Sequence, residues 1–585
     1  MFIFYILRMN YSQINSNLKT GYGFTDESVP LMAIRERLAN GQSSHSLPFS
    51  EPLLVFFWLA GESIYRYRVL GLIVLALIPF LFYVRNFSSL HINKYILLFL
   101  SFYMLVSVFT IPSVFRFLLV TPTYQWILLV CSVLLNVILI GRQPVMKLKI
   151  VLLHAALTTS IFAMILARAT SGGIGLISIL FYFALVNSWK DRSFKIIFVS
   201  QLSIWIIILS LNLSNLRNRF LESIKTSQAF DPNGYSLFPE ILDVLSGVSQ
   251  VFFFLVVPFY IIKKFKVFFT KNAFKLPFAK LAGLISTFVI IGIIVLSIYP
   301  QEQLAAFNLK SVYLTVLIAM LGGLLLDTRK YLALILISFL PYTSQFGSNT
   351  PASTNIQIIY ICQSLLLVNI IIMTLPTLSV QRNEERKVLS NRSASFYLLS
   401  LSAILISLMN YSDFVKSQVG ISYEKTLYPT ADSLSSLNGL YYTSEKLERL
   451  NEFVKYSTLR SNEEVIDLSS FHPGLIYYAG GIQSQRTLPD KYFIYNIKNQ
   501  IEFVLESQRE NMKLVGTKIL LETKFQLVSR ECRGISSLFA INEISDAIKG
   551  QGFDINVRPL AVYRSLPEDL TLFPNNVLLV ETCVK

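Results

Sequence analysis

An acidic pair near the amino terminus is the part of this sequence whose residue types and spacing best suit catalysis. Asp26 and Glu27 follow a polar and aromatic stretch that starts at Gly21. A carboxylate beside an acceptor hydroxyl can take its proton while the oxygen attacks another molecule. Asp26 is therefore the candidate general base, and Glu27 is an alternative base or a contact to a metal ion or acceptor. By itself, an Asp-Glu dipeptide is more often a solvated turn or a helix cap.

The composition places this pair in a membrane protein. Hydrophobic residues make up 53% of the 585 residues and charged residues 15%, with a mean hydropathy of +0.54, whereas soluble domains carry about a quarter charged residues. Four cysteines and four histidines, none paired at ligand spacing, indicate no zinc, haem or iron-sulfur site. Glu27 and Glu51 offer oxygen ligands for Mg²⁺ or Mn²⁺, but no spacing requires a metal.

Twelve apolar stretches of roughly 16 to 24 residues predict a polytopic all-α membrane domain over residues 1–411. The predicted spans are 66–84, 95–115, 117–140, 149–168, 174–188, 196–213, 245–262, 281–299, 311–326, 331–345, 356–378 and 396–410. Residues 1–7 are apolar but too short to span a membrane. We therefore expect that most of a first helix is missing from this sequence, which would give the complete protein thirteen spans.

Lysine and arginine collect on one side of these spans. The basic loops contain Arg85 and Lys94; Arg142, Lys147 and Lys149; Lys190, Arg192 and Lys195; Lys263, Lys264, Lys266, Lys271, Lys275 and Lys280; Arg329 and Lys330; and Arg382, Arg386, Lys387 and Arg392. Because cytoplasmic loops collect such residues, this side is cytoplasmic, and the net charge of +16 reflects topology and not a nucleic-acid partner. The first loop, 10–51, and the tail from about 412 then lie outside an inner (plasma) membrane that the chain crosses many times.

The first outside loop contains a second recognisable element after the acidic pair. Pro30 opens a helix with Leu31, Ile34 and Leu38 on one face and arginines and a glutamate on the other, and such a helix is expected to lie along the membrane surface. An apolar run at 53–60 and the turn Gly61-Glu62-Ser63 follow and lead into the span at 66–84. The loop therefore holds the acidic pair at the boundary of lipid and water.

The tail, 412–585, has the alternating charged and apolar segments of a soluble α/β domain of about 170 residues. Its pattern predicts a helix at 443–456 and strands at 464–468, 517–521 and 577–580. Outside the membrane, Cys532 and Cys583 would meet an oxidising compartment, which permits a disulfide, although two unpaired thiols fit the sequence equally well.

The predicted spans contain almost no ionisable residues, which counts against a proton-coupled transporter. His154 is the clear exception, and we expect it to be a packed residue that forms a hydrogen bond to a neighbouring helix. Gly172, Gly173 and Gly175 lack the flanking residues of a phosphate-binding loop, so close helix packing or a turn explains them.

Residues 21–85 resemble a known family. An acidic pair, a surface helix ending in Gly41-Gln42, a Pro-Leu-Leu apolar helix, a Gly-Glu-Ser turn and an arginine-rich start of a span occur in this order. This order resembles the GT-C superfamily of membrane glycosyltransferases, particularly the bacterial relatives of protein O-mannosyltransferases and aminoarabinose transferase. The chain departs from the family at Ser43-Ser44-His45-Ser46, where the family has aromatic and acidic residues.

The resemblance implies an enzyme that takes a sugar from a polyprenyl-phosphate carrier at the outer face of the membrane and transfers it to a cell-envelope glycan, lipid or protein. It implies inversion at the sugar carbon and a role for an aspartate of the first loop, here Asp26, at the acceptor. The leaving phosphate needs cationic partners. Arg116 is the first candidate, with a simple interfacial anchor as the alternative, and Arg217 and Arg219 are weaker candidates.

Two other functions compete with this interpretation. A transporter or lipid flippase is disfavoured by the uncharged spans and by the lack of matching broken helices in two halves. A polysaccharide polymerase or ligase would place catalytic arginine and histidine in a large loop between late spans, whereas the late outside loops, 300–310 and 346–355, are short. A noncatalytic assembly protein is a third, weaker alternative.

Overall fold

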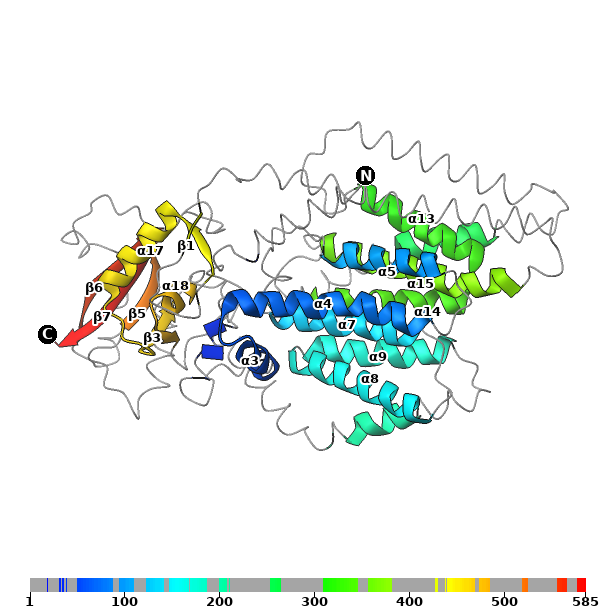
Figure 1. Cartoon of the computed structure of the whole chain (residues 1–585), viewed down its shortest axis with the longest axis horizontal. Coiled ribbons are helices and arrows are strands. Elements are labelled where there is room, and N and C mark those ends of the chain that lie inside the picture. The colour runs from blue at the N-terminus through cyan, green and yellow to red at the C-terminus, as the bar shows by residue number, and fades with distance from the viewer. Residues whose placement is uncertain are drawn as a thin grey trace.

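The computed structural model describes a helical bundle and a smaller part with β-strands near the carboxyl end (Figure 1). The residues that it describes are 18, 31–32, 34–35, 38, 50–87, 94–109, 122–140, 147–167, 169–186, 199–207, 210, 253–264, 309–345, 356–380, 427–429, 437, 439–468, 473–483, 518–523, 555–564 and 576–584. All structural statements below concern these residues.

Most bundle helices overlap spans that the hydropathy of the sequence predicts, and the first of them corresponds to the short apolar run at 53–60. They are α3 (Ser50–Leu59), α4 (Ile64–Phe87), α5 (Lys94–Phe109), α7 (Tyr124–Ile140), α8 (Lys147–Ala167), α9 (Ala169–Val186), α13 (Leu309–Leu325), α14 (Thr328–Ser338) and α15 (Ile356–Val380). Residues 199–207 and 253–264 are also helical and lie in or across the predicted spans at 196–213 and 245–262. The predicted spans at 281–299 and 396–410 lie outside the described residues.

The outer surface of the bundle is apolar. Among the described helices, one segment, Ile64–Val84 of α4, is long and apolar enough to cross a membrane, and α7, α8, α9, α13 and α15 contain shorter apolar segments. Large hydrophobic side chains on the outside include Phe80, Val151 and Phe181, each about 60% exposed. Soluble monomers rarely expose contiguous apolar surface of this kind, so the surface fits lipid surroundings.

The predicted span at 331–345 is not one straight helix. Asp327 caps α14 by accepting a hydrogen bond from the backbone N–H of Lys330 at 2.9 Å, α14 ends at Ser338, and a 3₁₀ helix, η1 (Leu340–Gln345), follows. Proline lacks an N–H and disfavours the α conformation in the residue before it. Pro341 therefore explains why the α-helix ends three residues earlier, at Ser338.

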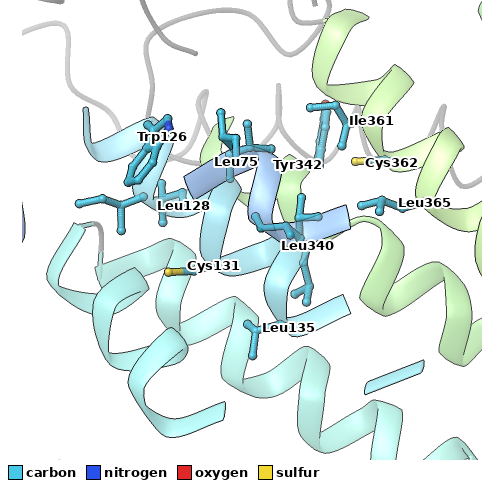
Figure 2. Packing of buried hydrophobic residues seen from close by; sticks show 14 of the residues in the cluster. Leu75, Trp126, Leu128, Cys131, Leu135, Leu340, Tyr342, Ile361, Cys362 and Leu365 are labelled. Atoms are coloured by element: carbon cyan, nitrogen blue, oxygen red, sulfur yellow. The ribbon is translucent and has the colours of Figure 1, made fainter. Parts of the chain in front are cut away.

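Helix α15 lies in the middle of the bundle, and residues 361–372 are buried throughout. Figure 2 shows Leu128 of α7, Leu340 of η1 and Leu365 of α15 in the same packed cluster, with the buried free thiols Cys131 and Cys362 nearby. Polar side chains of α15 pair with three other helices: Gln363 with Thr315 at 2.6 Å, Ser364 with Tyr103 at 3.0 Å and Asn369 with Ser338 at 2.7 Å. Such interhelical hydrogen bonds stabilise a bundle in lipid by about 0.6 kcal/mol each.

The C-terminal part contains two sheets. Strands β1 (Leu427–Pro429) and β2 (Tyr441–Thr443) form an antiparallel pair. The larger sheet has the order β4-β3-β5-β7-β6, with β3 (Glu464–Leu468) parallel to β4 (Ile482–Gln483) and β5 (Lys518–Thr523), and with β7 (Asn576–Val584) antiparallel to β5 and β6 (Ile555–Arg564). The predicted strands at 464–468, 517–521 and 577–580 are therefore confirmed. Cys583 lies in β7, while Cys532 is outside the described residues.

The predicted helix at 443–456 is α17 (Ser444–Ser457), which begins after Thr443 as its N-cap. Phe453 of α17 packs edge-on against Tyr563 of β6, with the ring centroids 6.4 Å apart. A second, short helix, α18 (Pro473–Tyr478), follows β3. The division of the chain at residues 411 and 412, and the solubility of the tail, remain predictions.

Candidate functional site

The five predicted site residues, Asp26, Glu27, Arg116, Arg217 and Arg219, lie outside the residues that the structure describes. The structure does describe what flanks two of their segments. Leu18 and the helical residues described within 31–38, which are 31, 32, 34, 35 and 38, flank the acidic pair. Pro122 follows the segment that contains Arg116. Of these flanking residues, Leu18 and Pro122 both accept hydrogen bonds from side chains at the beginning of α4.

The corner between α3 and α4 is a tight left-handed turn, as the Gly-Glu-Ser sequence predicts. Gly61 and Glu62 have φ angles of +63° and +57°. The N–H of Gly61 donates to the carbonyl of Trp58 at 2.9 Å, and the N–H of Glu62 donates to the carbonyl of Phe57 at 3.0 Å. The left-handed conformation costs a non-glycine residue about 1–2 kcal/mol, and strain of this kind clusters at functional sites. Glu62 is therefore a further acidic residue of interest at this corner.

Tyr67 joins the beginning of α4 to the beginning of α7. Its buried hydroxyl donates to the carbonyl of Pro122 at 2.7 Å, and its ring meets that of Phe57 edge-on at 5.4 Å. A Cβ atom on Gly71, one turn further along α4, would lie 2.7 Å from the Cγ of Pro122, so the two helices approach too closely for a larger residue there. From Pro122 to Arg116 a fully extended chain reaches about 21 Å at most.

Arg68, the next residue, holds the segment that leads to the acidic pair. Its side chain is 1% exposed, and its Nη1 donates to the carbonyl of Leu18 at 3.1 Å. A buried guanidinium is costly unless it is hydrogen-bonded, so this contact fixes Leu18 firmly. On the other side of the pair, Leu31 and Ile34 are also buried, and Asp26 is at most about 18 Å of extended chain from Leu31.

Arg35 has a role that its place in the sequence does not indicate. The helical pattern assigns it to the polar face, opposite Leu31 and Ile34. In the structure it is half-buried, and its Nη1 and Nη2 donate to the carbonyls of Tyr477 and Gly480 at 2.8 and 2.7 Å. Leu38, by contrast, is 42% exposed, as suits a helix that lies against lipid.

His154 is a packed helix residue, as predicted. Its Nδ1 accepts a hydrogen bond from the Nε2 of Gln201 at 2.7 Å, and its Nε2 lies 3.2 Å from the hydroxyl of Ser200. This arrangement assigns the ring proton to Nε2, because Nδ1 must accept from the amide. Gln201 also donates to the hydroxyl of Thr158 at 3.3 Å. These contacts join α8 to the helical residues 199–207.

The glycines of α9 are also explained in part by packing. A Cβ on Gly172 would overlap Ile165 of α8, and one on Gly175 would lie 3.2 Å from the Cε of Met164. A Cβ on Gly173 would meet nothing within 4 Å. Close helix packing is therefore confirmed at two of the three positions.

No group of three or more histidine, cysteine, aspartate or glutamate side chains that could hold a metal ion occurs among the described residues. Glu27 lies outside them, so whether Glu27 and Glu51 bind Mg²⁺ or Mn²⁺ stays as open as the sequence left it.

The contacts of Arg68 and Arg35 were not predicted from the sequence. An ionisable residue in the first two turns of an apolar helix is a signal for Arg68. The sequence has no comparable signal for Arg35, because its partners come from the other end of the chain.

The chain was compared with protein-family models, curated proteins and solved structures. No protein-family model matches the chain, and no curated protein matches it. Among solved structures, the chain is similar to the crystal structure of ArnT from Cupriavidus metallidurans in the apo state, with 11% sequence identity, a TM-score of 0.36 and coverage of 99% of this chain and 97% of that one. ArnT is an aminoarabinose transferase of the GT-C superfamily. At this TM-score, the functional proposal has to come from the residues of this chain.

Proposed function

We propose that the chain is a GT-C-type membrane glycosyltransferase. It moves a sugar from a polyprenyl-phosphate carrier to a cell-envelope acceptor at the outer face of the inner membrane. One observation carries the proposal: the consecutive residues Tyr67 and Arg68 bind the flanks of the segments in which the sequence places a general base and a phosphate-binding arginine. Transfer of a sugar from a phosphate carrier requires a general base and a cation for the phosphate close together, and a flank of each segment is bound at the beginning of α4.

The proposed reaction uses these groups in one displacement. The hydroxyl oxygen of the acceptor attacks the anomeric carbon of the sugar, and the bond from that carbon to the phosphate oxygen breaks. Asp26 takes the hydroxyl proton, and the bonding electrons leave with the lipid phosphate. Arg116 balances the charge of that phosphate, with Arg217 and Arg219 as weaker candidates for the same task. The family resemblance implies that the sugar carbon is inverted.

The lipid chain of the donor needs an apolar path to this point, because a polyprenyl chain must stay in hydrocarbon while its phosphate reaches polar groups. Helix α3 supplies apolar surface at the right place. Val55, Trp58 and Leu59 are 56%, 64% and 60% exposed, directly before the turn that leads to Tyr67 and Arg68. We therefore place the donor chain along α3, between it and the helical residues 31–38.

The test is sugar transfer by the purified full-length protein in lipid nanodiscs, with a labelled polyprenyl-phosphate sugar as donor. Asp26→Asn keeps the size of the side chain and removes its basicity, so we expect the rate to fall on the order of a hundredfold while donor binding persists. Glu27→Gln should have a smaller effect. Glu452→Gln, an exposed carboxylate on α17, is the matched control and should leave the rate unchanged.

The results of these variants distinguish a wrong choice of base from a wrong mechanism. If Asp26→Asn turns over normally while Glu27→Gln does not, the base is Glu27. If both variants are active, the proposed mechanism is wrong. Mass spectrometry of envelope lipids with and without the gene supplies a donor candidate, since loss of the transferase should make a polyprenyl-phosphate sugar accumulate. Movement of that lipid between leaflets without transfer would identify a flippase instead.

A further inference from the structure

The side chain of Arg35, in the first outside loop, contacts the backbone of the C-terminal part. Arg35 lies 442 residues from Tyr477 and 445 from Gly480 in sequence. We infer that Arg35 is a positioning residue through which the C-terminal part holds the segment of the proposed base, Asp26. The expected effect on sugar transfer rests on the proposed function, whereas the contact of Arg35 with the C-terminal part does not depend on that function.

The contact is specific to arginine. The two guanidinium nitrogens donate to two different carbonyls, and the centre of the guanidinium lies 5.1 Å from the centroid of the Tyr477 ring. The carbonyls belong to the end of α18 and the residues just after it, where a helix leaves its last carbonyls without partners in the helix. A planar fork can serve two such acceptors and stack on a ring at once, whereas a lysine ammonium is a point charge.

The acceptors of Arg35 are themselves fixed within the C-terminal part. The carbonyl of Gly480 also accepts from the N–H of Asn462 at 2.8 Å, directly before β3, and the N–H of Gly480 donates to the carbonyl of Tyr477 at 3.1 Å. Gly480 has a φ angle of +87°, which favours glycine. Arg35 therefore contacts a turn that is tied to the larger sheet.

A second contact joins the C-terminal part to α4. A Cβ atom on Gly439 would lie 3.4 Å from the Cβ and Cγ of Tyr65, and Gly439 has a φ angle of +89°. Tyr65 lies two residues before Tyr67 and three residues before Arg68. The C-terminal part thus contacts Arg35, which follows the acidic pair in sequence, and the beginning of α4, which binds Leu18 before the pair. Figure 1 shows the C-terminal part beside the first turns of α4.

This arrangement predicts a particular kinetic effect. Loss of the Arg35 contacts should let the helical residues 31–38 shift, and with them the segment that carries Asp26, while α4 still holds Leu18 and Pro122. A misplacement of about 1 Å can cost a hundredfold in rate. The turnover number should therefore fall, and the KM for the donor should change little.

The contact is tested first without any assay of transfer. Spin labels are placed on the full-length protein at Leu38→Cys and Tyr456→Cys, both exposed, with Cys532→Ser and Cys583→Ser in the background. Pulsed electron resonance in nanodiscs then gives the distribution of distances between the surface helix and α17. Arg35→Ala should broaden this distribution, and Arg35→Lys should give an intermediate width. An unchanged distribution in Arg35→Ala would overturn the inference.

Transfer kinetics form the second measurement. Arg35→Ala should lower the turnover number by on the order of tenfold or more, Arg35→Lys should recover part of it, and Arg449→Ala should change neither measurement, because Arg449 pairs with Glu445 within α17. A broadened distribution with normal turnover would refute the positioning role. A broadened distribution in a protein whose unsubstituted form transfers no sugar would leave the contact in place and refute the proposed function instead.

Discussion

Replacement of Gly322 by alanine should disrupt the contact among three helices of the bundle. A Cβ atom there would overlap Cδ2 and Cε2 of the Tyr331 ring. That ring is stacked on Phe259 with the centroids 4.2 Å apart and the planes 2° from parallel, and its hydroxyl donates to the carbonyl of Leu255 at 3.1 Å. Next to it, a Cβ on Gly323 would lie 2.7 Å from the carbonyl oxygen of Phe259. The Tyr331 ring is held on both sides, so it has to leave its place or push the helices apart.

The expected cost follows from these contacts. Overpacking of a core costs about 1–3 kcal/mol, the aromatic pair contributes about 0.5–1.5 kcal/mol, and the hydrogen bond contributes about 1 kcal/mol. Alanine regains about 1 kcal/mol over glycine in a helix. The Tyr331 ring either stays in place and is overpacked or moves away and loses its contacts, so these costs do not all apply at once. We therefore expect the substitution to lower the free energy of unfolding by about 2–4 kcal/mol in total.

The assay uses the buried thiols of the bundle. Cys131 and Cys362 are 8% and 0% exposed, so a thiol-reactive dye labels them only as the bundle unfolds, and Cys532→Ser with Cys583→Ser removes the other thiols. Gly322→Ala should lower the midpoint temperature of labelling by several degrees. Gly173→Ala is the matched control, since its Cβ would meet nothing within 4 Å, and it should keep or slightly raise the midpoint. Equal midpoints for the two variants would refute the packing argument.

Three further outcomes are expected. Tyr67→Phe removes the hydrogen bond to Pro122 and should cost about 1–3 kcal/mol in the same dye assay; it should also raise the KM for the donor if Arg116 binds phosphate. Gln201→Leu should cost about 0.6–2 kcal/mol and leave transfer unchanged, and a loss of transfer would contradict the packing role of His154. Burial raises the pKa of Tyr478 to about 12, so the folded state holds this proton more tightly than the unfolded state, whose pKa is about 10. The resulting stabilisation is lost as the pH rises from about 10 to 12, and Tyr478→Phe should flatten that part of the stability curve measured by chemical denaturation.

Most helix positions in the bundle could be predicted from hydropathy alone. In lipid, every backbone polar group must be satisfied within the structure, so a long apolar stretch becomes a helix whatever its neighbours are. The predicted span at 356–378 corresponds to α15, Ile356–Val380. The stretch at 331–345 was predicted less well, because a window of average hydropathy does not register Pro341, which ends the α-helix.

The strands of the C-terminal part show what local pattern can and cannot predict. The segment 464–468 was recognisable as a strand because it is a short run with the β-branched residues Val465 and Ile466, both of which are buried in the sheet. Its neighbours β4 and β5 were not recognisable as partners, because a parallel pair depends on a connection between strands. The order β4-β3-β5-β7-β6 therefore required the structure.

The contacts of Arg35 and Arg68 could not be predicted for a related reason. A helical wheel of residues 30–38 places Arg35 on the polar face, and water or an anion would satisfy it equally well there. Only the fold brings the carbonyls of Tyr477 and Gly480 to it. Likewise, the sequence allows Arg68, near the start of an apolar helix, to be an exposed anchor, whereas in the structure its side chain is buried and donates to the carbonyl of Leu18.

The first turn of α4 explains why tyrosine and arginine alternate in this part of the sequence. Residues at a membrane boundary can satisfy polar ends while their apolar parts stay in hydrocarbon. Tyr65 contacts Gly439, Tyr67 binds Pro122 and Arg68 binds Leu18, so within four residues one helix reaches the C-terminal part, the beginning of α7 and the segment before the acidic pair. Helix α4 is also the described helix long enough to span a membrane. A helix that is fixed in the bundle can hold several segments of the chain in one geometry, because displacement of any one segment is then resisted by the whole bundle.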